Sequence, residues 1–158
     1  MPAVQPHPLL RAAGAREQPG SLTLHIHIDG ASRGNPGEAG FGISVQDDRG
    51  ETQAELYGYL GRASNNVAEY QALLHALKWA AARGVRRLRV FSDSELVVKQ
   101  ISGEYRVKHP DMIPLHREAC GLLSRFAEAP VRHVRRAQNK DADRLANVAL
   151  DEKTSQLD

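Results

Sequence analysis

Cysteines, long hydrophobic runs and an excess of one charge are scarce or missing in this 158-residue sequence. The single cysteine, Cys120, cannot close an intrachain disulfide or form a cysteine-rich zinc site, so a disulfide-stapled secreted scaffold is excluded and a cytoplasmic location is expected. No apolar run approaches the roughly 18 residues of a membrane span, and no membrane contact is expected. The net charge of +2 excludes a polybasic tail that attracts partners by bulk charge.

Proline, glycine and apolar residues divide the chain into a leader, one domain and a tail. Residues 1–20 contain four prolines and little apolar sequence, so they are expected to form a flexible leader rather than a signal or transit peptide. The 41% apolar and 25% charged composition is typical of one soluble domain with a substantial core. We place this domain at residues 21–152, followed by a C-terminal tail at 153–158, and expect a monomer.

Hydrophobic patterns predict five strands and four helices in the order βββαβααβα. The expected strands are residues 22–28, 41–46, 52–60, 87–92 and 131–135, and the expected helices are residues 67–83, 95–101, 111–127 and a last one beginning near 139. Short turns join the first three strands, which should therefore be antiparallel. The later strands follow helices and should run parallel to the first. The prediction is an α/β fold with a five-stranded mixed sheet flanked by helices.

Four carboxylates are expected at strand ends or helix starts of this fold. Asp29 and Asp93 follow strands, while Glu69 and Asp143 fall in the first turns of helices. Ligands of parallel α/β sheets bind beyond the carboxyl ends of the strands, so the four acids could converge at one edge. Each also has a structural explanation as a turn residue, a helix cap or a partner of the helix dipole; Asn66 and Glu69, for instance, have capping-box spacing.

Convergence of these acids would make a site for hard cations. Clustered carboxylates repel one another unless their pKa values rise or a cation binds, and oxygen ligands suit Mg²⁺ or Mn²⁺ better than zinc. Two such ions can hold a phosphate oxygen, activate a water and stabilise a leaving oxygen. The combination therefore predicts nuclease chemistry.

Four stretches of the chain together carry a pattern that is more specific than any one of them. They are DGASRGNPG at 29–37, SNNVAEY at 64–70, FSDSELVVKQISG at 91–103 and NKDADRLAN at 139–147. In order and spacing, residues 22–150 resemble the type 1 ribonuclease H family, and especially its short archaeal-type and actinobacterial members.

This resemblance implies a ribonuclease H-like fold and endonucleolytic hydrolysis of the RNA strand of RNA/DNA hybrids, leaving 5′-phosphate and 3′-hydroxyl ends. It implies two Mg²⁺ or Mn²⁺ ions per active site. The family's metal-binding carboxylates fall on Asp29, Glu69, Asp93 and Asp143. Cleavage of double-stranded RNA is a further expectation from the short members.

The resemblance also implies substrate contacts. Those expected at the hybrid are Gly30, Asn35, Asn65, Asn66, Glu95 and Asn139, with Arg62 and Ser64 at a DNA-strand phosphate. A short amide can read the 2′-hydroxyl that distinguishes RNA from DNA. Glu95 stands where many members have glutamine, and its charge would repel phosphates, so either this contact is lost or Glu95 points elsewhere.

The loop before the last helix differs from that of larger bacterial members, which carry a catalytic histidine there. Residues 135–138 contain no histidine, but Arg136 matches an arginine of the short members. Arginine stays charged at neutral pH, so it can hold a phosphate or assist the leaving group but cannot act as a general base. A solvated basic loop is the alternative. The basic, tryptophan-bearing insertion of larger members is also absent, because residues 103–110 lead directly to the next helix.

Other functions remain open at this point. A catalytically silent module that binds hybrid or double-stranded RNA would not need the four acids. A related 3′ to 5′ exonuclease should carry Asp-x-Glu, which the sequence starting at Asp29 does not. A metal site at His25, His27 and Asp29 competes with hydrogen-bonded core histidines. Residues 83–144 hold 14 Lys and Arg against 8 Asp and Glu, and this net charge of +6 suits a phosphate-bearing partner.

Overall fold

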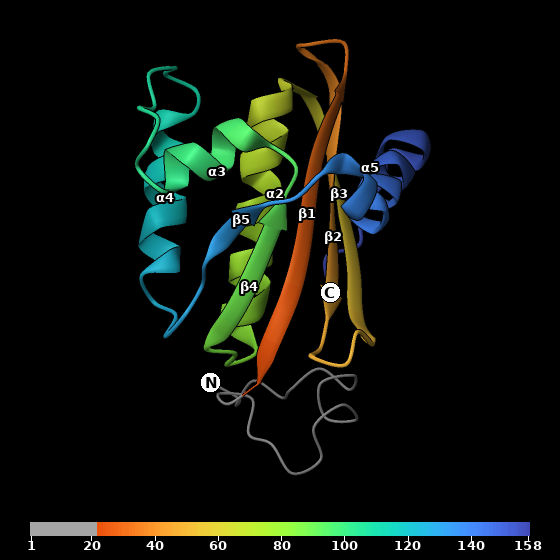
Figure 1. Ribbon diagram of the computed structural model, residues 1–158. Coiled ribbons are helices and arrows are strands. Elements are labelled where there is room, and N and C mark those ends of the chain that lie inside the picture. Colours follow the sequence, from red (N-terminus) through yellow and green to blue (C-terminus); the bar gives the residue numbers. More distant parts are fainter. Residues whose placement is uncertain (1–21) are drawn as a thin grey trace, which may run out of the picture.

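The computed structural model describes residues 22–158 and consists of one five-stranded sheet between layers of helices (Figure 1). The predicted leader lies outside the described residues. In chain order the elements are β1 (Thr23–Arg33), β2 (Gly37–Gln46), β3 (Thr52–Ala63), α2 (Asn65–Ala82), β4 (Arg87–Ser92), α3 (Glu95–Ile101), α4 (Ile113–Leu123), β5 (Val131–His133), the 3₁₀ helix η2 (Arg136–Gln138) and α5 (Lys140–Glu152). This order confirms the predicted βββαβααβα arrangement.

The strands lie in the spatial order β3-β2-β1-β4-β5. The first three pair antiparallel, while β4 runs parallel to β1 and β5 runs parallel to β4. Helices α2, α3 and α4 cover one face of the sheet, and α5 lies on the other (Figure 1). The predicted mixed sheet is therefore confirmed, with β1 at its centre.

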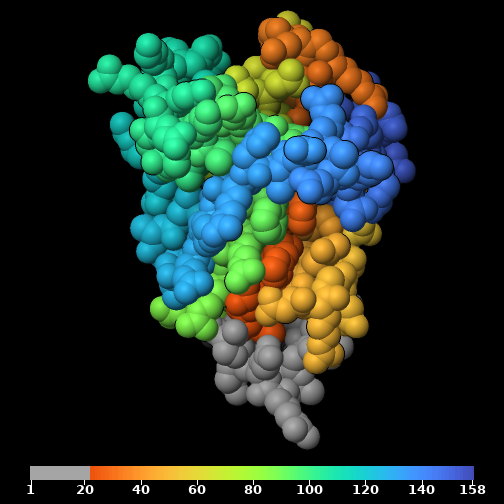
Figure 2. All heavy atoms as spheres, viewed as in Figure 1, coloured from red at the N-terminus to blue at the C-terminus, as the bar shows by residue number. Residues whose placement is uncertain are grey.

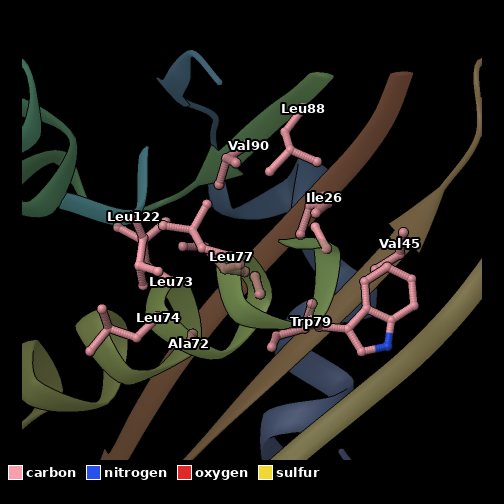
Figure 3. Packing of buried hydrophobic residues seen from close by; sticks show 14 of the residues in the cluster. Ile26, Val45, Ala72, Leu73, Leu74, Leu77, Trp79, Leu88, Val90 and Leu122 are labelled. Atoms are coloured by element: carbon pink, nitrogen blue, oxygen red, sulfur yellow. The ribbon is translucent and has the colours of Figure 1, made fainter. Parts of the chain in front are cut away.

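A single apolar core fixes β1 against α2. Ile26 of β1 and Leu77 of α2 are fully buried, and Val90 of β4 lies in the same cluster (Figure 3). Leu122 of α4 closes the far side of α2, which explains why this helix is buried around most of its circumference. Trp79 is buried and packs in this core. The core therefore holds rigid the strand that carries Asp29.

Two element boundaries differ from prediction in ways that affect the site. Helix α2 begins at Asn65, because the Ser64 hydroxyl accepts a hydrogen bond from the Val67 amide at 3.2 Å and caps the helix. The expected cap at Asn66 is wrong, and Glu69 lies in the second turn. Strands β1 and β2 also extend into the Gly/Pro segment as a paired hairpin, so Asp29 lies within β1 rather than at its end.

The remaining differences from the prediction lie at the ends of helices and strands. Strand β3 continues to Ala63, while α4 and β5 are shorter than predicted. In the expected tail, Gln156 forms a backbone bridge with Tyr57 of β3. Among the described residues, no helix is both long and apolar enough to cross a membrane.

Candidate active site

Three carboxylates meet where β1 and β4 separate. Their pairing ends at Ile28 and Ser92, so Asp29 and Asp93 are the first residues beyond it, while β1 continues alongside β2 alone. Glu69 approaches from α2. One carboxylate oxygen from each of the three acids lies within 4.8 Å of the other two. Asp93 precedes α3 but does not cap it, since Ser94 fills that role.

Gly30 allows α2 to bring Glu69 to this point. A Cβ atom on Gly30 would lie 2.3 Å from both the Ala68 carbonyl carbon and the Glu69 amide nitrogen. No side chain fits in that space, so the helix packs directly on the backbone of β1. The Gly30 amide donates a hydrogen bond to the Glu69 carboxylate. Gly30, expected as a substrate contact, lines the cavity and also sets the distance between two acids.

Helix α5 brings Asp143 by a similar close approach. A Cβ on Gly42 of β2 would lie 2.1 Å from the Ala142 carbonyl oxygen. Asp143 is exposed in the first turn of α5 and hydrogen-bonds to the Asp29 carboxyl, although it is outside the tight group of three.

Asn139 joins the start of α5 to β1. The side-chain amide nitrogen of Asn139 donates to the Ile28 carbonyl at 2.9 Å, and the backbone carbonyl of Asn139 accepts from the Asp143 amide at 3.1 Å. The side chain is 1% exposed and does not line the catalytic cavity. Its expected role as a substrate contact is therefore disfavoured, and the geometry makes it a connection between the backbones that carry Asp29 and Asp143.

Burial and neighbouring charge shift the pKa values of Asp29 and Glu69. Burial raises the pKa of Asp29 from 3.8 to about 8, and the charges of Asp93 and Asp143 add to this effect. Burial also raises the pKa of Glu69 well above its ordinary value, with Asp29 adding to the shift and the Gly30 amide opposing it. One Glu69 oxygen is buried without a hydrogen-bond partner. Buried oxygen ligands of like charge, one of them unpaired, fit a hard divalent cation.

The alternative histidine site is not formed in the part of the chain that the structure describes. His25 contacts Asp48 at 2.7 Å, and His27 stacks on Phe91 with ring centroids 4.8 Å apart. Burial lowers the pKa of His27. Within residues 22–158, the only group of three or more potential metal ligands within 4.8 Å of one another is Asp29, Glu69 and Asp93.

The acids line a cavity of about 460 Å³. The predicted residues that share this cavity are Asp29, Gly30, Asn65, Asn66, Glu69, Asp93, Arg136 and Asp143. Arg136 belongs to η2, in the loop before α5, and lines the cavity with the acids. Residues 135–138 are all exposed, as those of a solvated loop would also be, and the phosphate contact of Arg136 remains a prediction. The sequence reasoning missed Asn147, which lines the cavity one helical turn after Asp143; that four-residue spacing was the available signal.

The asparagines also hold the entrance of the site together. The Asn65 side chain accepts from the Ser32 amide at 2.8 Å, and the Asn35 side chain accepts from the Asn65 amide at 3.1 Å. These bonds join the β1–β2 hairpin to the start of α2, and contacts of these side chains with substrate remain predictions.

Arg62 and Ser64 line a neighbouring cavity of about 700 Å³, which adjoins the start of α2. Glu95 is exposed, pairs with Lys99 at 2.7 Å and lies outside the catalytic cavity. Of the two readings of Glu95, the structure therefore supports the one in which it points elsewhere.

Comparison with known proteins identifies the family. Residues 27–149 match the family model described as "Reverse transcriptase-like". The crystal structure of RNase H1 from Halobacterium salinarum superposes with a TM-score of 0.80 at 43% identity, covering 82% of this chain and 98% of that one. The chain belongs to the ribonuclease H family. The predicted family and the ribonuclease H-like fold are thus confirmed.

This chain covers different shares of the length of its other relatives. A bifunctional protein of Mycobacterium tuberculosis is 47% identical over 131 residues, covering 82% of this chain and 36% of its own. The curated ribonuclease HI of Halobacterium salinarum is 43% identical over 129 residues, again 82% of this chain, and this chain spans 65% of it. The structure of LC11-RNase H1 in complex with RNA/DNA hybrid has a TM-score of 0.78 at 36% identity, covering 82% of this chain and 98% of that one.

Proposed function

We propose that this chain is an endonuclease that hydrolyses the RNA strand of RNA/DNA hybrids. The observation that carries the proposal is the meeting of Asp29, Glu69 and Asp93, with Asp143 beside them, in one open cavity of a ribonuclease H fold. The hybrid bound by LC11-RNase H1, a relative of similar length, supports this substrate. A silent binding module would be destabilised by the four acids and would gain nothing from them.

We propose that the four carboxylates hold two Mg²⁺ or Mn²⁺ ions, with Asp29 shared between them. Glu69 and Asp93 would complete one site and Asp143 the other. When bound, such ions polarise the scissile phosphate, lower the pKa of a water and neutralise the leaving oxygen. The rise in the pKa values of Asp29 and Glu69 supports this assignment, because cation binding would remove the repulsion that causes part of it.

The remaining residues would bind and orient the hybrid. The Arg136 guanidinium, at the cavity wall, would hold a phosphate oxygen and offset charge that develops on it. Asn66 and its neighbour Asn65 would read the 2′-hydroxyls of the RNA strand. Arg62 and Ser64 would hold a phosphate of the DNA strand, which keeps the RNA strand over the acids. The expected products carry 5′-phosphate and 3′-hydroxyl ends.

The test is cleavage of 5′-labelled RNA/DNA hybrid, duplex DNA and duplex RNA, with and without Mg²⁺ or Mn²⁺. Internal cuts in the RNA of the hybrid, only with metal, are expected. Asp143→Asn should lower kcat at least about 100-fold. Asp141→Asn is the matched control, since both acids lie in the first turn of α5 but only Asp143 lines the cavity. Absence of internal cleavage, or equal activity of the two variants, would overturn the proposal.

Three narrower expectations accompany this proposal. The duplex RNA arm tests whether double-stranded RNA is also cleaved. A monomeric state is checked by light scattering of the purified protein. A cytoplasmic location stays a prediction from the single cysteine.

A further inference from the structure

The sheet carries a basic surface on the side opposite α2. Helix α5 packs mainly on β2, with contacts to β1 and β3, and leaves β4 and β5 largely uncovered on this side. Figure 2 shows this side, where atoms of β4 (green) and β1 (red) are visible between β5 (blue) and the hairpin of β2 and β3 (yellow). We define the basic sheet face by the residues that point there, which are His25, His27, Arg87, Arg89, Phe91 and Arg132.

Strand alternation and register assign these side chains to one face. Leu88 and Val90 of β4 are buried in the core, so Arg89 and Phe91 point to the opposite side, and Arg89 is exposed. The register places Arg89 beside His25 and Arg132 beside Phe91.

The rings on this face are ordered across the strands. Phe91 stacks on His27 with centroids 4.8 Å apart and planes 25° apart, and it lies 6.3 Å from His25 with planes 12° apart. Arg89 and Arg132 thus flank a row of stacked rings that remain half-buried.

The positive charge of this face is incompletely neutralised. Within residues 22–158, neither Arg89 nor Arg132 forms an ion pair, whereas Arg33 and Arg144 each contact an acid. The acids nearby are Glu128, which lies beside Arg87 in a backbone bridge, Asp48, which pairs with His25, and Asp141, which acts on His27. The two guanidinium groups that flank the rings are therefore free to meet anions.

We propose that the basic sheet face binds single-stranded nucleic acid. Single strands bind where a positive surface follows the phosphates and aromatic rings stack on the bases, and an open sheet with aromatic residues is one such surface. Arg89 and Arg132 supply the charge, while Phe91 and His27 supply the rings. An acidic peptide would use the charge but not the rings.

The position of this face suits a single-stranded flank of the nuclease's substrate. Strand β5 carries Arg132 on the basic sheet face, and four residues later Arg136 lies at the catalytic cavity. A strand that leaves the cavity therefore reaches this face across one chain connection. The proposal extends beyond the hydrolysis proposed above, and binding is measurable without it.

The experiment measures fluorescence anisotropy of a labelled single-stranded oligonucleotide with the full chain in EDTA, over a series of salt concentrations. Arg89→Gln with Arg132→Gln should weaken binding about 20-fold at 0.1 M salt and lower the salt slope by about 1.4, if each guanidinium neutralises one phosphate. Arg117→Gln with Arg125→Gln is the matched control, because both are exposed, form no ion pair in the described chain and lie on or after α4. This pair should change affinity less than about twofold.

Two further variants separate charge from fold and from stacking. Arg89→Lys with Arg132→Lys keeps the positive charge and should keep the salt slope of the unmutated protein. This expectation holds even if the glutamine pair lowers the stability of the fold. Phe91→Leu should weaken binding at least about fivefold with the slope unchanged, because base stacking is insensitive to salt.

Several outcomes would overturn the proposal. Equal losses of affinity in the Arg89/Arg132 variant and in the Arg117/Arg125 control would mean that the oligonucleotide is held by the net charge of the protein alone. No loss of affinity in either variant would mean that the basic sheet face binds no nucleic acid. Weakened binding of an acidic peptide, with the oligonucleotide unaffected, would make the face a protein surface. If the Arg89/Arg132 variant lost affinity for a short blunt RNA/DNA hybrid as much as for the single strand, the basic sheet face would belong to the surface that binds the hybrid.

Discussion

Strand β1 presents apolar side chains to one side of the sheet and polar side chains to the other. Toward α2 it places Leu24, Ile26 and Ile28, all fully buried, and toward the opposite side His25, His27 and Asp29. Burial of the first three stabilises the fold, because apolar surface leaves water. Burial of Asp29 destabilises it, because a carboxyl loses hydration beside other acids. One strand therefore separates stability from chemistry by alternate residues.

Removing side chains from the apolar side should have the largest effect on stability. Ile26→Ala should lower the free energy of unfolding by about 2–5 kcal/mol, because the core around Ile26 is closed and leaves a cavity. Urea unfolding followed by circular dichroism measures this change. His25→Ala, one residue away on the polar side, is the control and should cost less than about 1 kcal/mol. Similar losses in both variants would contradict the separation of the two sides.

The buried acid on the polar side of β1 should make the stability of the metal-free protein depend on pH. Asp29 keeps its proton in the folded state until about pH 8, whereas the unfolded chain releases it near 3.8. Between these values the unfolded state binds fewer protons, so the free energy of unfolding falls as pH rises from about 4 to 8. A fall on the order of 3 kcal/mol is expected, less than the full pKa difference implies because the acids share protons.

Asp29→Asn is the variant that tests this dependence. It should lower the slope, with the part due to the buried Glu69 remaining, and stabilise the metal-free protein at pH 8, measured by urea unfolding across the pH range in EDTA. Mg²⁺ should stabilise the unmutated protein more than the variant at that pH. A flat pH profile of the unmutated protein would show that Asp29 is not perturbed in the way the geometry indicates.

Asn139 connects the polar side of β1 to α5, and its removal should have a smaller effect. Asn139→Ala leaves the buried Ile28 carbonyl without its donor, which should cost about 1–3 kcal/mol. Loosening of Asp143 should lower kcat about tenfold with little change in KM. Asp141→Asn is the control, because Asp141 is exposed in the same first turn of α5 and does not line the catalytic cavity. If the activity of Asn139→Ala falls only in proportion to its unfolded fraction, the residue does not position the site.

The sequence predicts the chemistry of this site better than its geometry. Asp29, Glu69, Asp93 and Asp143 could be selected because local patterns place each acid near an end of an element, and such patterns depend on nearby residues only. The exact start of α2 was missed because Ser64 and Asn66 both suit a cap, and only the pairing of β3 up to Ala63 decides between them.

Contacts between distant segments leave weaker traces in one sequence. Gly30 and Gly42 look like ordinary turn or strand glycines, yet each is required because a helix backbone lies where a Cβ would be. Asn139 was expected to face substrate, since an amide near a helix start gives no sign that it will bond to a strand 111 residues away. The basic sheet face was visible only as a net charge of +6, because its grouping depends on strand register.

Glu95 marks the outer boundary of the site, and its substitution should have the smallest effect. Its carboxylate is fully exposed and 2.7 Å from Lys99, one helical turn further along α3, which lowers its pKa and directs it away from the cavity. Glu95→Gln restores the family's more common residue and should change kcat/KM on hybrid less than about twofold, because exposed charges are well screened. Lys99→Gln is the control, since it frees Glu95 from its partner and should weaken hybrid cleavage if the released carboxylate turns toward the phosphates. A gain of more than about fivefold for Glu95→Gln would instead place this side chain at the bound RNA, because removing a charge next to phosphates would then relieve repulsion.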